Sequence, residues 1–263
     1  GMLVGTVEEV GPDSPLGLRP GDRVATLVSL TLTPLVIEDA LAHWDGLEEQ
    51  VPCDGYAVLF GRSIAAVLPD DLSTELSLSA MDVCGAPALT ARVVAGHAAR
   101  DDRAPTVAVV GGAGKSGSLS LAAAPRAGAG RTIGVVPLER EAELLRGAGL
   151  ADEVVLADAR DPIALRDAVA AAGGPADVTV VCVDVPGCEG GAVLATADRG
   201  TVVFFSMATS FSAAALGAEG LAADVTMLVG NGYLPGHADY ALQLLREDAG
   251  VRGLFERRLG VHA

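Results

Sequence analysis

The chain has 263 residues, of which half are hydrophobic, and a formal net charge of −16. This length suits one large or two modest domains, and the negative charge argues against nucleic acid or an anionic membrane as a partner, because phosphate groups would be repelled. Four cysteines without a CxxC pair, no signal peptide, and no apolar run near the ~20 residues that cross a bilayer predict a cytoplasmic protein with reduced thiols.

Residues 3–75 have a β-rich pattern. We predict strands at 3–10, 24–30, 56–60 and 63–68, separated by turns rich in Gly, Pro and Asp. The acidic residues 38–50 are predicted to form a surface helix or a lid. Ser29, Thr31 and Thr33 would share one strand face, where they could line a substrate cleft or flank a hydrophobic edge.

From residue 73 to about residue 97 the pattern is helical, with Pro87 as an interruption. Beyond a charged connection at 101–105, apolar strands alternate with helices. The predicted strands are 106–110, 132–136, 153–156, 178–183, 201–205 and 225–229, and the predicted helices are 115–127, 139–147, 161–172, 188–197, 212–220 and 236–248. Such alternation predicts an α/β fold, a Rossmann-type doubly wound parallel sheet, in a domain spanning 83–263.

A glycine-rich loop follows the strand 106–110 and opens the next helix. In this GxGxxG pattern, Gly112 permits a tight turn, Gly114 lets the backbone approach a pyrophosphate, and Gly117 lets helix and strand pack closely. Lys115 and Ser116 complete the predicted dinucleotide-binding set. The alternative is a merely structural turn between strand and helix.

Lys115 is the only lysine among the 18 basic residues, and it stands where an ammonium could meet a phosphate. The run Gly114-Lys115-Ser116 resembles the end of a phosphate-binding P-loop. That motif needs a glycine five positions before Gly114, where this chain has Val109, so a kinase or NTPase is not expected.

The residue that selects the cofactor normally follows the loop by about 20 positions and is acidic. Val136 occupies that place. Glu139 could substitute for the acid, and Arg140 could pair with a 2′-phosphate. We expect NAD as the cofactor, with NADP as the alternative.

Other candidate site residues follow the later strands, at the edge where open α/β sheets bind ligands. Asp184 is expected to lie along the cofactor, and Ser206, Met207 and Thr209 to hold the nicotinamide, unless they form an ordinary polar loop. Tyr233 and His237 follow the last strand. His237 could exchange a proton near neutrality with Tyr233 orienting it, or it could be a plain surface residue.

Several stretches resemble known families. Residues 5–11, 21–24 and 145–154 are similar to medium-chain dehydrogenases/reductases. Residues 25–35, 198–200, 204–211, 214–220 and 230–233 resemble, more closely, the L-erythro-3,5-diaminohexanoate dehydrogenase family of that superfamily. The resemblance covers nearly all of the chain.

The resemblance implies NAD(P)-dependent oxidative deamination of L-erythro-3,5-diaminohexanoate, in lysine fermentation, to 5-amino-3-oxohexanoate and ammonia. It implies a small cationic amino-acid substrate and a dimer joined through the strand 225–229. Residues 1–82 would form a GroES-like catalytic barrel, incomplete because the strands that usually precede Gly5 are missing and the chain stops soon after its last helix. The alternatives are a zinc-free reductase or quinone oxidoreductase of the superfamily, and a nucleotide-sensing protein without catalysis.

No metal is expected. Cys84 stands where alcohol dehydrogenases can carry one zinc ligand, but a catalytic zinc site normally takes three protein ligands. We predict that Cys84 is a buried apolar thiol.

Overall fold

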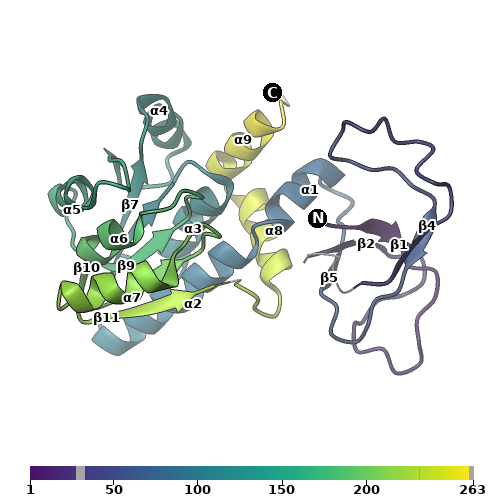
Figure 1. The fold of residues 1–263 in the computed structure, drawn as a ribbon, viewed down its shortest axis with the longest axis horizontal. Helices are drawn as coiled ribbons and strands as arrows, with labels where there is room; N and C mark the ends of the chain where they lie inside the picture. The colour runs from purple at the N-terminus through teal and green to yellow at the C-terminus, as the bar shows by residue number, and fades with distance from the viewer. Residues whose placement is uncertain (28–32, 231, 261–263) are drawn as a thin grey trace. The chain divides into compact units, whose positions relative to one another are not determined.

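The computed structural model describes residues 1–27, 33–230 and 232–260 (Figure 1). The chain forms two compact units, Gly1–Leu78 and Ser79–Ala263. Ser29 and Thr31 of the predicted hydroxyl face lie outside the described residues, whereas Thr33 is partly buried. The functional division predicted between residues 82 and 83 falls in the break after helix α1 (Thr74–Met81), and it stays a prediction.

The first unit holds two small antiparallel sheets. One has the strand order β1-β2-β5, formed by Val4–Thr6, Arg23–Thr26 and Ala65–Val67. The other pairs β3 (Leu35–Ile37), which has no counterpart in the sequence-based prediction, with β4 (Gly55–Ala57). Strands β1, β4 and β5 are shorter than the strands predicted at 3–10, 56–60 and 63–68, and residues rich in Gly, Pro and Asp form turns beside them.

Residues 38–50, all of which the structure describes, form turns and bends, so the prediction of a surface helix there was wrong. Asp39 Oδ1 accepts a hydrogen bond from the Leu41 amide (3.1 Å), and Asp45 Oδ1 accepts from the amides of Leu47 and Glu48 (2.9 Å each). Short acidic side chains bonded to nearby amides offer the backbone an alternative to the helix. These local bonds therefore outcompete helix formation.

The second unit is built on a six-stranded parallel sheet. Its strands are β6 (Thr106–Val110), β7 (Arg131–Val136), β8 (Glu153–Leu156), β9 (Ala176–Val181), β10 (Thr196–Phe204) and β11 (Val225–Val229). Their order, β11-β10-β9-β6-β7-β8, is that of a Rossmann sheet, with the topological switch point between β6 and β9. The predicted doubly wound α/β architecture is thereby confirmed.

Helices cover both faces of this sheet (Figure 1). One group, whose members contact one another, contains α2 (Gly85–Asp101), α3 (Lys115–Arg126), α4 (Glu139–Ala148), α8 (His237–Glu247) and α9 (Ala249–Arg258). The other contains α5 (Pro162–Ala171), α6 (Glu189–Ala195) and α7 (Phe211–Gly220). Strand β6 is buried on both sides, with Val107 to Val110 at most 2% exposed. This explains its continuous apolar sequence.

Two helical features differ from the prediction. The break between α1 and α2 falls at residues 82–84, whereas Pro87 lies in the first turn of α2, where an amide hydrogen has no intrahelical partner to lose. The chain also continues past α8 into α9, whose first turn is capped by Asp248 through the Val251 amide (3.1 Å).

The length and hydropathy of the described helices bear on whether any of them could span a membrane. No single helix is long and apolar enough to span a bilayer, but the bent pair α1 and α2, at 47° to each other, passes by length and composition.

Candidate functional site

The glycine loop turns tightly between β6 and α3. The amides of Gly111 and Gly112 donate to the Val135 carbonyl of the neighbouring strand β7 (2.8 and 3.2 Å), which ties the start of the loop to the sheet. Gly111 has a φ of +83°, a backbone conformation that favours glycine. The chain thus changes direction at the carboxyl end of β6.

Gly117 is the position where the loop has no room for a side chain. A Cβ there would collide with the Gly111 carbonyl oxygen and lie 2.8 Å from its carbon. At Gly112 a Cβ would lie 3.0 Å from Leu145 Cδ2 and 3.1 Å from Leu121 Cδ1. The contact at Gly117 agrees with the close packing predicted for that glycine, and the contacts at Gly112 show that this position is tightly packed as well. Their roles in binding a pyrophosphate stay predictions.

The amino end of α3 faces out of the glycine loop without a side-chain cap. Gly114 is its N-cap residue, and within the part of the chain that the structure describes the helix has no side-chain cap. Uncapped amides and the positive end of the helix dipole together form an anion site. Ser116 lies in this first turn and is partly buried. The structure therefore places the predicted loop residues where they could bind a phosphate group.

Lys115 is paired with a residue that sequence analysis did not single out. Its Nζ lies 2.6 Å from Asp82 Oδ2, and the two side chains are 34% and 52% exposed. An ion pair this exposed is worth ~0–1 kcal/mol, so the ammonium can leave it for a phosphate. Asp82 is remote from the loop in sequence, and nothing in the sequence pattern signals the contact.

A second basic group reaches the loop from α9. Arg258 donates through its guanidinium to the Ala113 carbonyl (2.8 Å). This residue was missed because α9 itself was missed. The contact places a permanent positive charge beside the proposed pyrophosphate position.

The end of β7 carries the residues considered for cofactor choice. Val136 is buried, and the Glu139 carboxylate accepts from Arg146 (2.8 Å). Arg140 is exposed and makes no hydrogen bond or ion pair with any residue that the structure describes. It lines a hollow of about 540 Å³ between α4 and α9, together with Arg257. Of the residues considered, Arg140 is thus the one whose charge is available to a ligand.

The loops after β9 and β10 lie at the same sheet edge as the glycine loop, because these parallel strands are neighbours of β6 in the order β10-β9-β6. Asp184 is exposed, and Met207 is 96% exposed. Ser206 Oγ accepts from the Ala208 amide (3.1 Å), and Thr209 is partly buried. The structure therefore brings these four predicted residues to the edge that carries the glycine loop.

Glu189 holds the loop after β10 in place. Its side chain is 4% exposed, and its Oε1 accepts from the Ser210 amide (2.6 Å). No local sequence pattern points to Glu189, because its hydrogen-bond partner is 21 positions away in the chain.

Tyr233 and His237 are in contact. Their rings meet edge to face, 5.1 Å apart between centroids and at 82°. His237 is the first residue of α8 and is 8% exposed, so it is not a plain surface residue, whereas Tyr233 is 51% exposed. Burial lowers the pKa of His237 below its usual value, against the opposing charge of Asp239. Burial thus favours the neutral form of the His237 imidazole.

The segment before Tyr233 is packed against α2. A Cβ on Gly232, which has a φ of +68°, would lie 2.5 Å from the Gly85 carbonyl. Nearby, Cys84 is 3% exposed, and burial raises the pKa of its thiol to about 12. Such a thiol stays protonated and packs as an apolar side chain.

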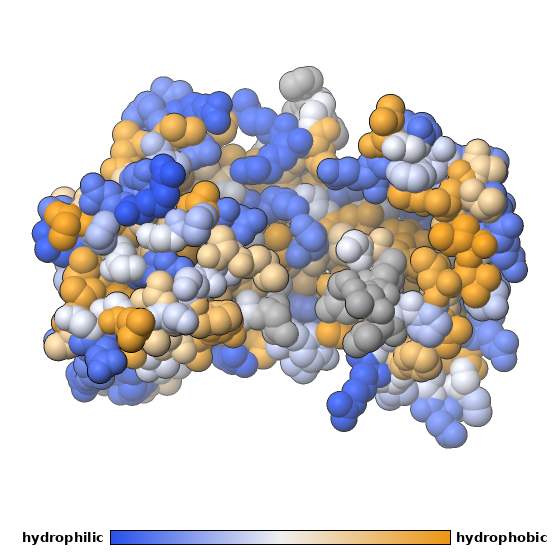
Figure 2. Space-filling view, viewed as in Figure 1, coloured by the Kyte–Doolittle hydropathy of each residue, from blue (hydrophilic) through white to orange (hydrophobic). Residues whose placement is uncertain are grey.

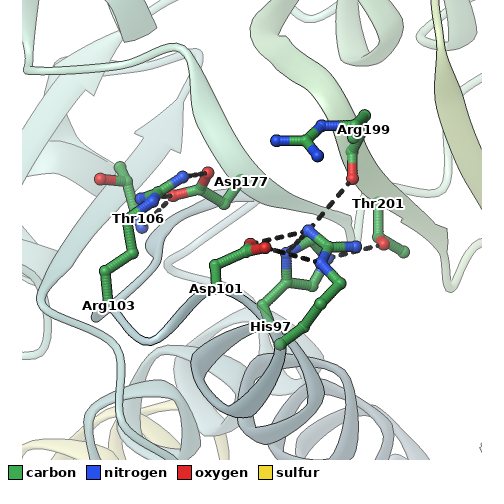
Figure 3. Close-up of polar contacts among 8 residues, drawn as sticks. His97, Asp101, Arg103, Thr106, Asp177, Arg199 and Thr201 are labelled. Carbon is green, nitrogen blue, oxygen red and sulfur yellow. Dashed lines mark hydrogen bonds and ion pairs between the residues drawn. The ribbon is translucent and has the colours of Figure 1, made fainter.

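A further polar cluster lies at the opposite, amino end of the strands (Figure 3). His97 of α2 contacts Thr201 Oγ1 through Nε2 (2.8 Å), and Arg103 forms a bidentate ion pair with Asp177, the second residue of β9. Asp177 also accepts from the Thr106 amide (2.8 Å) at the start of β6. These contacts hold α2 and the segment after it against the amino ends of β6, β9 and β10. That edge of the sheet is opposite the one that carries the glycine loop.

Comparisons with known proteins give a consistent result. Residues 1–69 match the family model described as the L-erythro-3,5-diaminohexanoate dehydrogenase N-terminal domain. The chain is 43% identical over 263 residues to the L-erythro-3,5-diaminohexanoate dehydrogenase of Acetoanaerobium sticklandii, covering 98% of this chain and 74% of that protein. Identity to the enzyme of the same name from Fusobacterium nucleatum is 44% over 261 residues, covering 97% and 73%.

The fold is shared with solved structures. A mycobacterial protein crystallised with NADPH aligns with a TM-score of 0.58 at 19% identity, covering 99% of this chain and 77% of that protein. This likeness concerns the fold alone. The family follows from the extent of the identity to the two dehydrogenases: the chain belongs to the L-erythro-3,5-diaminohexanoate dehydrogenase family.

Proposed function

We propose that this protein oxidises L-erythro-3,5-diaminohexanoate with NAD(P) to 5-amino-3-oxohexanoate and ammonia. The observation that carries the proposal is the 43% identity to a dehydrogenase of that name across 98% of the chain. The uncapped helix behind Gly114 and the close packing at Gly117 support dinucleotide binding. The net charge of −16 suits a substrate that carries two ammonium groups and one carboxylate.

We place the dinucleotide across the carboxyl edge of the sheet. Gly112, Gly114 and Gly117, with the amides of Lys115 and Ser116, would hold the pyrophosphate. Asp184, Ser206, Met207 and Thr209 would lie along the nicotinamide half, since their loops follow the adjacent strands. When bound, the nicotinamide supplies the hydride acceptor for C3 of the substrate.

Tyr233 and His237 are proposed to carry the proton transfers. The 3-ammonium must lose a proton before C3 can be oxidised, and a neutral imidazole can accept it. Water then adds to the C3 iminium, and the resulting carbinolamine releases ammonia as its C–N bond breaks. The edge contact from Tyr233 would keep the His237 ring oriented during these steps.

The decisive experiment measures binding and turnover separately. Calorimetric titration with NAD and with NADP comes first, followed by NADH or NADPH formation with 3,5-diaminohexanoate, and with lysine as the control substrate. We expect binding, turnover with the diamino acid only, and loss of turnover but not of cofactor binding in His237→Asn. Binding without turnover on the diamino acid would refute the substrate, and absence of binding would refute the dinucleotide site.

An exposed edge strand suggests that two copies of this chain associate. Strand β11 is at the edge of the sheet, and Val229 at its end is 62% exposed. Edge strands offer unpaired backbone groups to a second chain. We propose that two chains form a homodimer by pairing through β11. We also propose that the protein is located in the cytoplasm, where its four free thiols stay reduced. A monomeric mass by light scattering would contradict the dimer.

A further inference from the structure

The segment between β3 and β4 is unusually acidic and has little to hold it. Residues 38–54 include six carboxylates and neither lysine nor arginine. The strands that it joins are three residues long and exposed, with Val36 40% and Tyr56 52% exposed. Figure 2 shows hydrophobic side chains on the surface of this first unit. A two-stranded sheet without a covered face is marginal alone.

Three side chains of this segment converge at the point where it leaves and rejoins the sheet. One possible ligand atom each from Asp39, His43 and Asp54 lies within 4.8 Å of the other two. Asp39 comes just after β3 and Asp54 just before β4, and the Glu38 amide donates to the Asp54 carbonyl (2.8 Å). The backbone thus holds the two carboxylates near each other, and His43 reaches them from the turn.

The two carboxylate oxygens of Asp39 differ in their contacts among the described residues. Oδ1 accepts from the Leu41 amide, whereas Oδ2 is fully enclosed and makes no hydrogen bond to any part of the chain that the structure describes. A buried acceptor without a partner costs ~1–3 kcal/mol, and more when it is charged. No described arginine pairs with Asp39 or Asp54. Within the described ranges, no arginine or lysine therefore balances the charge of these two carboxylates.

We propose that Asp39, His43 and Asp54 bind one divalent transition-metal cation of the zinc class. An imidazole nitrogen with two carboxylates suits Zn²⁺, whereas Mg²⁺ and Ca²⁺ prefer oxygen ligands throughout. Ligand atoms around tetrahedral Zn²⁺ lie roughly 3.3 Å apart, as its bond lengths near 2.0–2.1 Å require. The ligand atoms now lie within 4.8 Å of one another, so side-chain rotations that shorten these separations by up to about 1.5 Å would complete the site, with water as a fourth ligand.

The bound ion would cross-link the two ends of residues 38–54. It would join the two ends of the turn region through the carboxylates of Asp39 and Asp54, and neutralise part of the local charge. Metal binding that needs the folded arrangement stabilises that arrangement. The three residues belong to the first unit, whereas the proposed cofactor residues belong to the second. The proposal differs from the expectation that the chain takes no metal.

The fluorescence of Trp44 can report metal binding at this site. Trp44 is the only tryptophan, it follows His43 directly, and its indole Nε1 donates to the Glu48 carbonyl (2.9 Å). The chelator-treated chain is titrated with Zn²⁺ while Trp44 emission and heat are recorded, without cofactor or substrate. We expect one saturable site per chain, and an affinity lower by at least about tenfold in His43→Gln and in Asp54→Asn.

The matched control is Asp45→Asn. It removes the same charge from the same segment, and asparagine can keep the turn bonds to Leu47 and Glu48, so its Zn²⁺ affinity should equal that of the parent. Zn²⁺ binding that survives both His43→Gln and Asp54→Asn, or that millimolar Ca²⁺ displaces equally well, would overturn the proposal.

A second measurement on the unaltered chain covers the case in which a variant misfolds. Co²⁺ is added in place of Zn²⁺, because its visible absorption reports the coordination geometry and the ligands. A four-coordinate spectrum with nitrogen coordination that equimolar Zn²⁺ abolishes is expected, and the spectrum of the hexaaqua ion alone would overturn the site.

Discussion

Replacement of Gly117 by alanine probes the packing of α3 on β6. The added Cβ would lie 2.8 Å from the Gly111 carbonyl carbon and 2.9 Å from Gly112 Cα, and would collide with the Gly111 oxygen. These are backbone atoms, so no side-chain rotation can relieve the contact. Because carbon atoms pack at ~3.5–4.0 Å, α3 must move away from the loop by roughly 1 Å.

The expected magnitudes follow from two opposing effects. Overpacking costs ~1–3 kcal/mol, while alanine in place of glycine within a helix returns ~1 kcal/mol. The free energy of unfolding should therefore fall by up to ~2 kcal/mol. Cofactor affinity should suffer more, because the amides that would face the pyrophosphate move with the helix, and displacements of ~1 Å can cost as much as ~100-fold in a precisely placed site. We expect at least a tenfold loss.

The assay combines urea unfolding with NADH titration by fluorescence. Gly96→Ala is the matched control, since Gly96 lies within α2 and has nothing within 4 Å of an added Cβ. That substitution should stabilise the protein by up to ~1 kcal/mol and leave NADH affinity unchanged. If Gly117→Ala behaves like Gly96→Ala in both measurements, the close approach of α3 to the loop is not what requires glycine.

Three further predictions concern charged groups. Burial, with Arg100 nearby, lowers the pKa of His97 in the folded state, so the unfolded chain binds more protons and stability should fall as the pH drops below about 6.5. His97→Gln should reduce that fall by up to ~1.4 kcal/mol per pH unit, and an unchanged slope of urea midpoints against pH would count against it. Asp82→Asn should tighten NADH binding severalfold by releasing Lys115, with unfolding changed by less than ~1 kcal/mol; weaker calorimetric binding would contradict this. Arg140→Ala should weaken NADP binding about tenfold while leaving NAD binding nearly unchanged, and equal losses would exclude a 2′-phosphate contact.

The parallel sheet was largely predictable from sequence. Strands β6, β8 and β11 begin and end at the predicted residues, and each remaining strand of the sheet overlaps its prediction. Burial on both faces explains the continuous apolar run of β6. The edge strands β8 and β11 are only partly buried, but each is still a short run rich in apolar, β-branched residues. The glycine loop was predictable for a related reason, because steric limits on the backbone leave glycine as the residue that fits.

The small sheets of the first unit were harder to predict. Strand β3 has exposed side chains and no alternation, so its pairing with β4 leaves no pattern in the sequence. Helix α9 was missed because Gly250 and Gly253 weaken its helical signal, although Asp248 caps it. There, a tertiary contact at Gly250, where a Cβ would strike the Ala148 carbonyl, requires the residue that local propensity disfavours.

The partners of the site residues were beyond prediction for one reason. Asp82, Glu189 and Arg258 each contact the carboxyl edge of the sheet through a hydrogen bond to a residue at least 21 positions away. Periodicity and loop motifs report local structure, whereas such pairs depend on how helices cross. These residues come together only when the chain folds.

The position of Lys115 has a practical side for anyone who handles this protein. Besides the amino terminus, its ammonium is the only aliphatic amine in the chain, and a third of the side chain is exposed. Amine-reactive dyes, cross-linkers and sensor surfaces will therefore attach at the amino terminus and at the glycine loop. A chip coupled in this way would block the very site under study, whereas protection of Lys115 by a dinucleotide during brief acylation would provide a footprint readable by mass spectrometry.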